Sequence, residues 1–144
     1  MAATAFFRDH AGRVLLVNPS YKDTWDLPGG AVEEDESPHA ACRREVLEEL
    51  GLDRAPGGIL AVDWVPARPE RPEGLIVVYD GGVLSDAEIG QIVLADGELT
   101  GFAFTARAEV ANLVTPLLAR RVASCLRAVE ERRTAALENG DPAA

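Results

Sequence analysis

Apolar residues occur along this chain in short runs that are bounded by turn-forming residues. Residues 3–8 and 13–18 are two such runs, and the turn Asp9-His10-Ala11-Gly12 between them predicts a β-hairpin. The later apolar runs that predict strands are residues 59–65, 75–79 and 99–104. A proline-rich loop with charges of both signs, residues 66–74, lies between the first two of these later runs.

Two segments carry a helix start signal, a hydroxyl residue followed by proline. Ser37-Pro38 and Thr115-Pro116 each place a capping hydroxyl before a proline at the first helical position, where no amide hydrogen is needed. Gly51 is a stop signal for the first helix, and apolar spacing predicts that the second helix covers residues 117–137. Strands on either side of helices predict the α/β class, with a mixed sheet between helical layers.

The first predicted helix has two unlike faces. At about 100° per residue, Glu45, Glu48 and Glu49 fall within one arc. The apolar residues expected on the opposite, core-facing side are Ala40, Val46, Leu47 and Leu50. Neighbouring carboxylates on a helix repel one another, and a hard cation with oxygen ligands would reverse that cost. The pattern therefore favours Mg²⁺, or Mn²⁺, bound on a solvent-facing carboxylate stripe, although such stripes are in general simply solvated.

Two further charged residues have spacings that suit the same ion. Glu36 lies just before the helix, where it could reach the cation directly or through water, and Arg44 is one turn from Glu48, the interval of an orienting ion pair. The whole segment resembles the Nudix box, G-x5-E-x7-R-E-U-x-E-E-x-G-U with U aliphatic. The positions that match are Gly30, Glu36, Arg44, Glu45, Val46, Glu48, Glu49, Gly51 and Leu52.

The resemblance implies a fold and a chemistry. It implies a Nudix-like α/β/α sandwich with a mixed sheet, expected as a single domain over residues 1–138 with a loose tail over residues 139–144. It also implies a metal-dependent pyrophosphohydrolase that activates water against a diphosphate. By this similarity Glu45, Glu48 and Glu49 would ligate the metal, with a backbone carbonyl at Gly29 or Gly30.

The resemblance does not decide which carboxylate is the general base. Glu48 is one candidate, within a catalytic group that also includes Glu45 and Arg44. Glu98, just before the strand predicted over residues 99–104, is the other candidate, and its alternative interpretation is a solvated loop residue.

Three residues outside the box are candidates for substrate binding. Trp25 could stack on a nucleobase or belong to the core. Arg68 and Arg71 in the proline-rich loop could hold a distal phosphate or ribose, or be solvated charges. His10 and His39 are interpreted as a turn residue and an exposed helix-start residue.

Composition limits the choice of partners. A net charge of −10 and a pI near 4.6 argue against binding to nucleic acid or an anionic membrane through a basic surface. Cys42 and Cys125 are expected to be reduced thiols, and the N-terminus has no export signal, so a cytoplasmic location is expected. The expected partner is a small nucleotide-type substrate, and a homodimer stays open.

Three functions remain after this reasoning. The first is hydrolysis of a nucleoside diphosphate derivative, either of the nucleotide-sugar or ADP-ribose class or a nucleoside triphosphate. The second is a nucleotide-binding regulatory module without turnover, which would not need Arg44 and the three helix glutamates together. The third is a prenyl-type isomerase, for which Cys42 lies in an unsuitable place, within the box helix.

Overall fold

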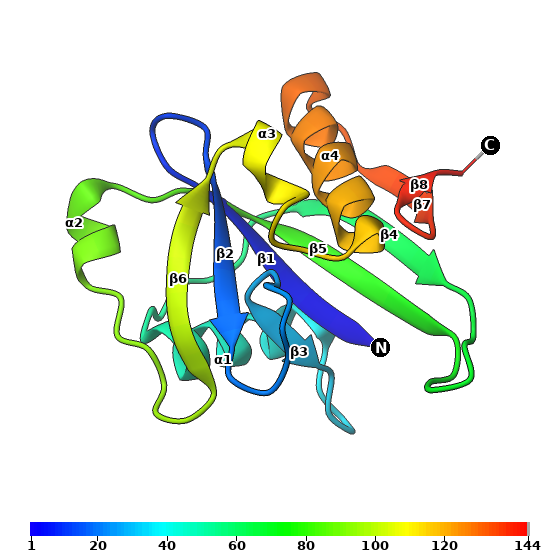
Figure 1. The fold of residues 1–144 in the computed structure, drawn as a ribbon, viewed down its shortest axis with the longest axis horizontal. Coiled ribbons are helices and arrows are strands. Elements are labelled where there is room, and N and C mark those ends of the chain that lie inside the picture. Colours follow the sequence, from blue (N-terminus) through cyan, green and yellow to red (C-terminus); the bar gives the residue numbers. More distant parts are fainter. Residues whose placement is uncertain (144) are drawn as a thin grey trace.

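A mixed sheet of eight strands forms the centre of the computed structural model of this chain, which describes residues 1–143 (Figure 1). Its elements are β1 (Ala2–Arg8), β2 (Val14–Pro19), β3 (Gly29–Ala31), α1 (Pro38–Leu50), β4 (Ile59–Val65), β5 (Gly74–Val83), α2 (Asp86–Gly90), β6 (Leu99–Thr105), α3 (Arg107–Val110), α4 (Pro116–Glu131), β7 (Ala135–Glu138) and β8 (Asp141–Pro142). The strand order is β6-β2-β1-β5-β4-β7-β8, with β3 paired to β1 outside this path. β1 is parallel to β5 and β4 to β7, and the other pairs are antiparallel.

The sheet is covered on both faces because successive side chains of a strand point to opposite sides. Phe6 and Leu16 belong to a core under α3 and α4, whereas Ala5, Phe7 and Leu15 belong to a second core under α1. In Figure 1, α1 passes behind the strands and α4 lies in front of them. This arrangement confirms the predicted α/β/α sandwich.

The helix start signals act as the sequence predicts. The Ser37 hydroxyl accepts a hydrogen bond from the amide of Ala40, and the Thr115 hydroxyl accepts one from the amide of Leu118, at 3.1 and 3.2 Å. Gly51 ends α1 in the left-handed conformation, with φ of 70°. Capping and backbone preference therefore fix these three helix ends.

The end of the last helix differs from the prediction. The sequence predicts a helix to residue 137, but α4 ends at Glu131 and Arg132 turns left-handed, with φ of 52°. Ala135 and Leu137 then alternate into the core as part of β7, which pairs in parallel with β4. Buried residues spaced two apart have the period of a strand rather than of a helix, and the free edge of β4 supplies the strand with backbone partners.

The C-terminal segment also differs from the loose tail predicted over residues 139–144. Asn139 and Gly140 both have positive φ, 54° and 86°, and form a tight turn that pairs β8 with β7. Asn-Gly is a strong signal for such a turn, and the sequence interpretation missed it. The last residue, 144, lies outside the described residues, and the domain boundary at residue 138 stays a prediction.

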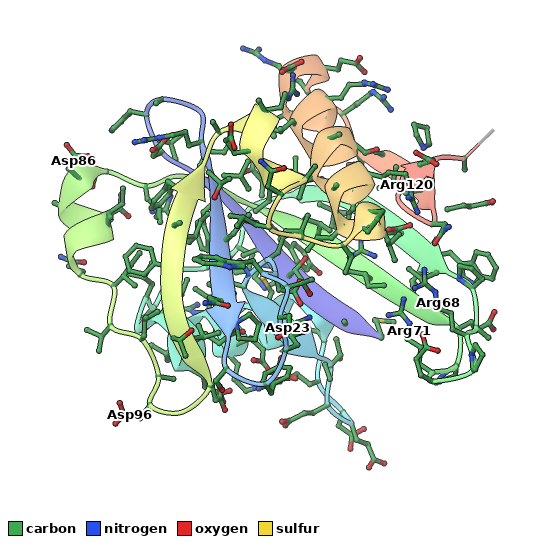
Figure 2. The ribbon with its side chains drawn as sticks, in the orientation of Figure 1. Asp23, Arg68, Arg71, Asp86, Asp96 and Arg120 are labelled. Atoms are coloured by element: carbon green, nitrogen blue, oxygen red, sulfur yellow. The ribbon has the colours of Figure 1, made fainter. Side chains whose placement is uncertain are left out.

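A buried ion pair attaches this hairpin to the rest of the molecule. Asp63 on β4 is fully buried, and its carboxylate accepts hydrogen bonds from the Arg121 guanidinium at 2.7 Å and the Gly140 amide at 3.0 Å. The hydroxyl of Ser124 donates to the Gly140 carbonyl at 3.0 Å, and Arg120, labelled in Figure 2, donates to that of Asn139 at 3.1 Å. One carboxylate therefore joins a strand, a helix and a turn.

Across residues 1–143, no helix combines the length and the apolarity that crossing a membrane requires.

Replacing Asp63 with alanine should strongly destabilise the fold, because the Arg121 guanidinium and the Gly140 amide would then be buried without a partner. We expect the free energy of unfolding to fall by about 3–5 kcal/mol in urea denaturation. Asp53→Ala is the matched control, since Asp53 forms an exposed ion pair with Arg43 at 2.9 Å and should cost under about 1 kcal/mol. Equal losses in the two variants would contradict the role given to Asp63.

Candidate functional site

Two consecutive glycines, Gly29 and Gly30, form the corner where the chain enters β3 and pairs with β1. A Cβ atom at Gly29 would lie 2.3 Å from the Ala3 carbonyl oxygen, and the φ of Gly29 is 144°. A Cβ atom at Gly30 would lie 2.7 Å from the carboxylate carbon of Glu45. The first glycine therefore lets two backbones meet, and the second lets a helix carboxylate rest against the backbone.

Glu49 on α1 is buried at this corner, with 6% of its surface exposed. Its carboxylate accepts a hydrogen bond from the Gly29 amide at 2.9 Å. Burial, followed by the nearby charges of Glu45, Asp26 and Glu98, raises the pKa of Glu49 to about 8, and the hydrogen bond from Gly29 acts in the opposite direction. Glu49 is thus a carboxyl group whose ionised form its surroundings disfavour.

The predicted division of α1 into a core face and a carboxylate face is partly wrong. Glu49 faces the interior, whereas Leu47, expected in the core, is 46% exposed. Ala41, Cys42, Val46 and Leu50 are the apolar residues of α1 that the fold buries. Helical periodicity gives the angles between Glu45, Glu48 and Glu49 but not the rotation of the helix on the sheet. The packing of α1 on β1 and β3 turns Glu49 toward the interior.

Arg44 lies at the centre of the other box carboxylates. Its guanidinium donates to Glu36 at 2.7 and 2.9 Å, to Glu45 at 3.0 Å and to Glu48 at 3.3 Å, and also to the carbonyl oxygen of Ala31 at 3.2 Å. The hydrogen bond to Glu36 is the main reason that the pKa of Arg44 is raised, and in return it lowers the pKa of Glu36. Arg44 therefore orients the carboxylates of Glu36, Glu45 and Glu48.

The donors at this corner fit a hard divalent cation. Glu45 and Glu49 present carboxylate oxygens next to the backbone of Gly29 and Gly30, and oxygen donors are what Mg²⁺ prefers. An added cation would also supply the positive charge that buried Glu49 lacks. Within residues 1–143, however, no three acidic, histidine or cysteine side chains already converge as a ligand set. The fit rests on the chemistry of the donors.

A cavity of about 610 Å³ opens beside the same two glycines. Its lining residues are Ala2, Thr4, Tyr21, Lys22, Thr24, Trp25, Asp26, Leu27, Gly29, Gly30, Arg68, Glu70, Arg71, Ile76, Thr115, Leu117, Leu118 and Arg121. The structure thus brings Trp25, Arg68 and Arg71, the candidates for substrate binding, next to the Gly29–Gly30 loop. Trp25 also packs against the core beneath α4, as its core interpretation predicts, and its stacking on a nucleobase stays a prediction.

Glu98 lies close enough to Glu49 for its charge to raise the pKa of that residue. The backbone carbonyl of Glu98 accepts a hydrogen bond from the Ser20 amide at 2.9 Å, which holds the start of β6 against the loop after β2. Glu98 thus lies near Glu49 on a segment separate from α1. Both Glu98 and Glu48 stay candidates for the general base.

The residue that sequence reasoning missed is Asp26. Asp26 lines the cavity, and its carboxylate accepts a hydrogen bond from the Lys22 ammonium group at 2.7 Å. Its charge also raises the pKa of Glu49. The available signal was its place in the segment Trp25-Asp26-Leu27-Pro28-Gly29, which leads directly into the box.

The histidines and cysteines do not belong to this site. His39 contacts Tyr79 edge-on and lies 3.2 Å from the Pro56 carbonyl oxygen, and His10 is an exposed turn residue. Cys42 and Cys125 are buried, and burial raises the pKa of both thiols to about 12. Neither thiol has the depressed pKa of a nucleophile.

Comparison with protein families identifies the fold and the box together. The family model described as NUDIX domain matches residues 1–125. The chain belongs to the Nudix family.

Individual relatives agree with this assignment. Residues of this chain are 42% identical over 62 positions to diphosphoinositol polyphosphate phosphohydrolase 2 of Rattus norvegicus, covering 42% of the chain and 35% of that protein. The match therefore spans about a third of the length of this curated relative.

Solved structures resemble the whole chain. A MutT protein from Methanosarcina mazei Go1 superposes with a TM-score of 0.70 at 26% identity, covering 92% of this chain and 94% of that one. A UDP-X diphosphatase gives a TM-score of 0.78 at 19% identity over 95% of this chain and 66% of its own, which shows a shared fold.

The two glycines should respond differently to alanine. Gly30→Ala requires only that the flexible end of Glu45 move, so the melting temperature should stay near that of the parent while Mn²⁺ affinity falls by about 10–100-fold. Gly29→Ala places a methyl group against backbone at unfavourable φ and should cost at least about 2 kcal/mol of stability. Thermal melts and paramagnetic Mn²⁺ titration separate the two effects. Equal destabilisation by both substitutions would contradict the separate roles.

Proposed function

We propose that this chain is a Mg²⁺-dependent hydrolase, with Mn²⁺ as an alternative ion, that cleaves the diphosphate link of a nucleoside diphosphate derivative. The observation that carries the proposal is the buried carboxylate of Glu49, which the Gly29 amide holds next to Glu45, while a cavity opens at Gly29 and Gly30. A module that only bound nucleotides would not need a buried carboxylate without a compensating charge at that position.

Each box residue has a part in this proposal. Glu45, Glu48 and Glu49 would hold the metal with the backbone of Gly29 or Gly30, and Glu36 would assist directly or through water. The bound ion would neutralise charge on the diphosphate and make a water molecule more acidic. Arg44 would keep the carboxylates in place through its hydrogen bonds, as an outer partner of the ligands.

A carboxylate would take the proton of the attacking water. Glu98 reaches the neighbourhood of Glu49 from the loop that precedes β6, and Glu48 on α1 is the alternative. A general base must lie within hydrogen-bond distance of the attacking water. Glu98 and Glu48 lie on different segments, so each would contact that water from a different side.

The cavity limits the substrate to a small molecule. About 610 Å³ suits a compound of nucleotide size, and Trp25 and Tyr21 in its wall offer aromatic surface to a base. The relatives named above as a diphosphoinositol polyphosphate phosphohydrolase and a UDP-X diphosphatase suggest the diphosphates to test first.

The direct test is phosphate release from a panel of diphosphates, coupled to excess phosphatase. The panel holds ADP-ribose, a UDP-sugar, a nucleoside triphosphate and a diphosphoinositol polyphosphate, each with Mg²⁺, Mn²⁺ or EDTA. We expect turnover of at least one compound that EDTA abolishes. Nucleotide binding without turnover of any compound would instead support a regulatory module.

Replacing Glu49 with glutamine should remove a charged ligand while keeping its shape and the hydrogen bond from Gly29. We expect kcat/KM to fall by at least about 100-fold. Stability of the metal-free protein should stay equal or rise, because glutamine cannot ionise in a position where burial disfavours the charged carboxylate. Glu130→Gln on α4, an exposed glutamate far along the chain from the box, is the control. A variant that kept near-parental activity would defeat the assignment of Glu49.

A further inference from the structure

Four basic side chains line the cavity, and only two of them are neutralised. Lys22 pairs with Asp26 and Arg121 pairs with Asp63, both at 2.7 Å. Arg68 and Arg71 make no side-chain hydrogen bond or ion pair with any residue among residues 1–143. Both arginines are exposed, and they place two uncompensated positive charges at one cavity of a chain whose net charge is −10.

The backbone holds these two arginines next to each other. The amides of Arg68 and Arg71 donate to each other's carbonyl oxygens, at 2.8 and 3.0 Å, across the two-residue turn Pro69-Glu70. Figure 2 shows both side chains on the β4–β5 loop, beside the N-terminal end of β1. Like charges at directly opposed positions are destabilising, so this arrangement costs free energy in the absence of an anion.

The acidic residues of the same loop do not remove this charge. Glu73 accepts a hydrogen bond from the Trp64 indole at 3.2 Å, on the other side of the loop. Glu70 lines the cavity but pairs with neither arginine. The loop therefore leaves one excess positive charge facing the cavity, counting Arg68 and Arg71 against Glu70.

We propose that Arg68 and Arg71 bind a second phosphate group of the substrate, separate from the diphosphate at the Gly29–Gly30 loop. This inference rests on the proposed function and narrows it to substrates that carry a phosphate monoester besides the diphosphate link. A phosphate accepts parallel hydrogen bonds from guanidinium groups, and one between Arg68 and Arg71 would reverse their repulsion. The two arginines would thus determine specificity, while the box carries the chemistry.

The first test compares substrates that differ by one phosphate. ADP-ribose and ADP-ribose 2′-phosphate share the diphosphate link, and the parent should prefer the phosphorylated compound by about tenfold in kcat/KM. The double variant Arg68→Gln, Arg71→Gln should lose this preference. Arg127→Gln, which removes an exposed arginine of α4 outside the cavity, should keep the preference. An equal loss on both substrates would overturn the inference.

The second test does not depend on hydrolysis. AMP and adenosine 2′,5′-bisphosphate contain no anhydride bond, so calorimetry in Mg²⁺ reports binding alone. We expect tighter binding of the bisphosphate to the parent and equal binding of both nucleotides to the double variant, with a difference that shrinks at high salt. Equal affinities in the parent would overturn the inference. A preference for the bisphosphate in a protein without turnover would leave the anion site standing and reject the hydrolase.

Discussion

The close approach of α1 to the Gly29–Gly30 corner is the constraint on which the site depends. Gly29 allows the backbone of β3 to lie close to that of β1 at Ala3, and Gly30 allows the Glu45 carboxylate to pack against the backbone of the glycine corner. The same approach buries Glu49 and gives its carboxylate one amide donor. The fold therefore accepts the cost of a buried acidic group at the corner where we propose that a metal ion binds, and the absence of two side chains makes that arrangement possible.

Charge in this protein is arranged in two opposed regions around that corner. Glu36, Glu45 and Glu48, before and on α1, are gathered around the guanidinium group of Arg44, so negative charge dominates there. Across the loop, the cavity carries Arg68 and Arg71, whose side chains have no partner among residues 1–143. A substrate that carries phosphate groups meets its complement in the second region directly, and in the first only with a divalent cation between them. This division fits the proposed reaction, with a metal ion at the glutamates and recognition of phosphate at the two arginines.

The cavity wall depends on contacts far from the box. Arg121 lines the cavity and is fixed by Asp63, which also holds the turn at Gly140. The C-terminal hairpin thereby supports α4, whose first turn lies against the cavity through Leu117 and Leu118. Asn139-Gly140 encodes that turn locally, so the sequence contains the signal. Its consequence for α4 arises only because the hairpin packs against the helix.

The sequence alone determined the family, the sandwich, the ends of α1 and the set of box residues, because capping, glycine conformation and fixed spacing are local properties. Tertiary structure decided which way those residues face. Helical periodicity fixes angles between side chains but not the rotation of a helix on its sheet, so Glu49 is buried and Leu47 exposed against expectation. It also decided that Asp26, Arg68 and Arg71 meet at one cavity, since they lie on loops that only the folded sheet brings together.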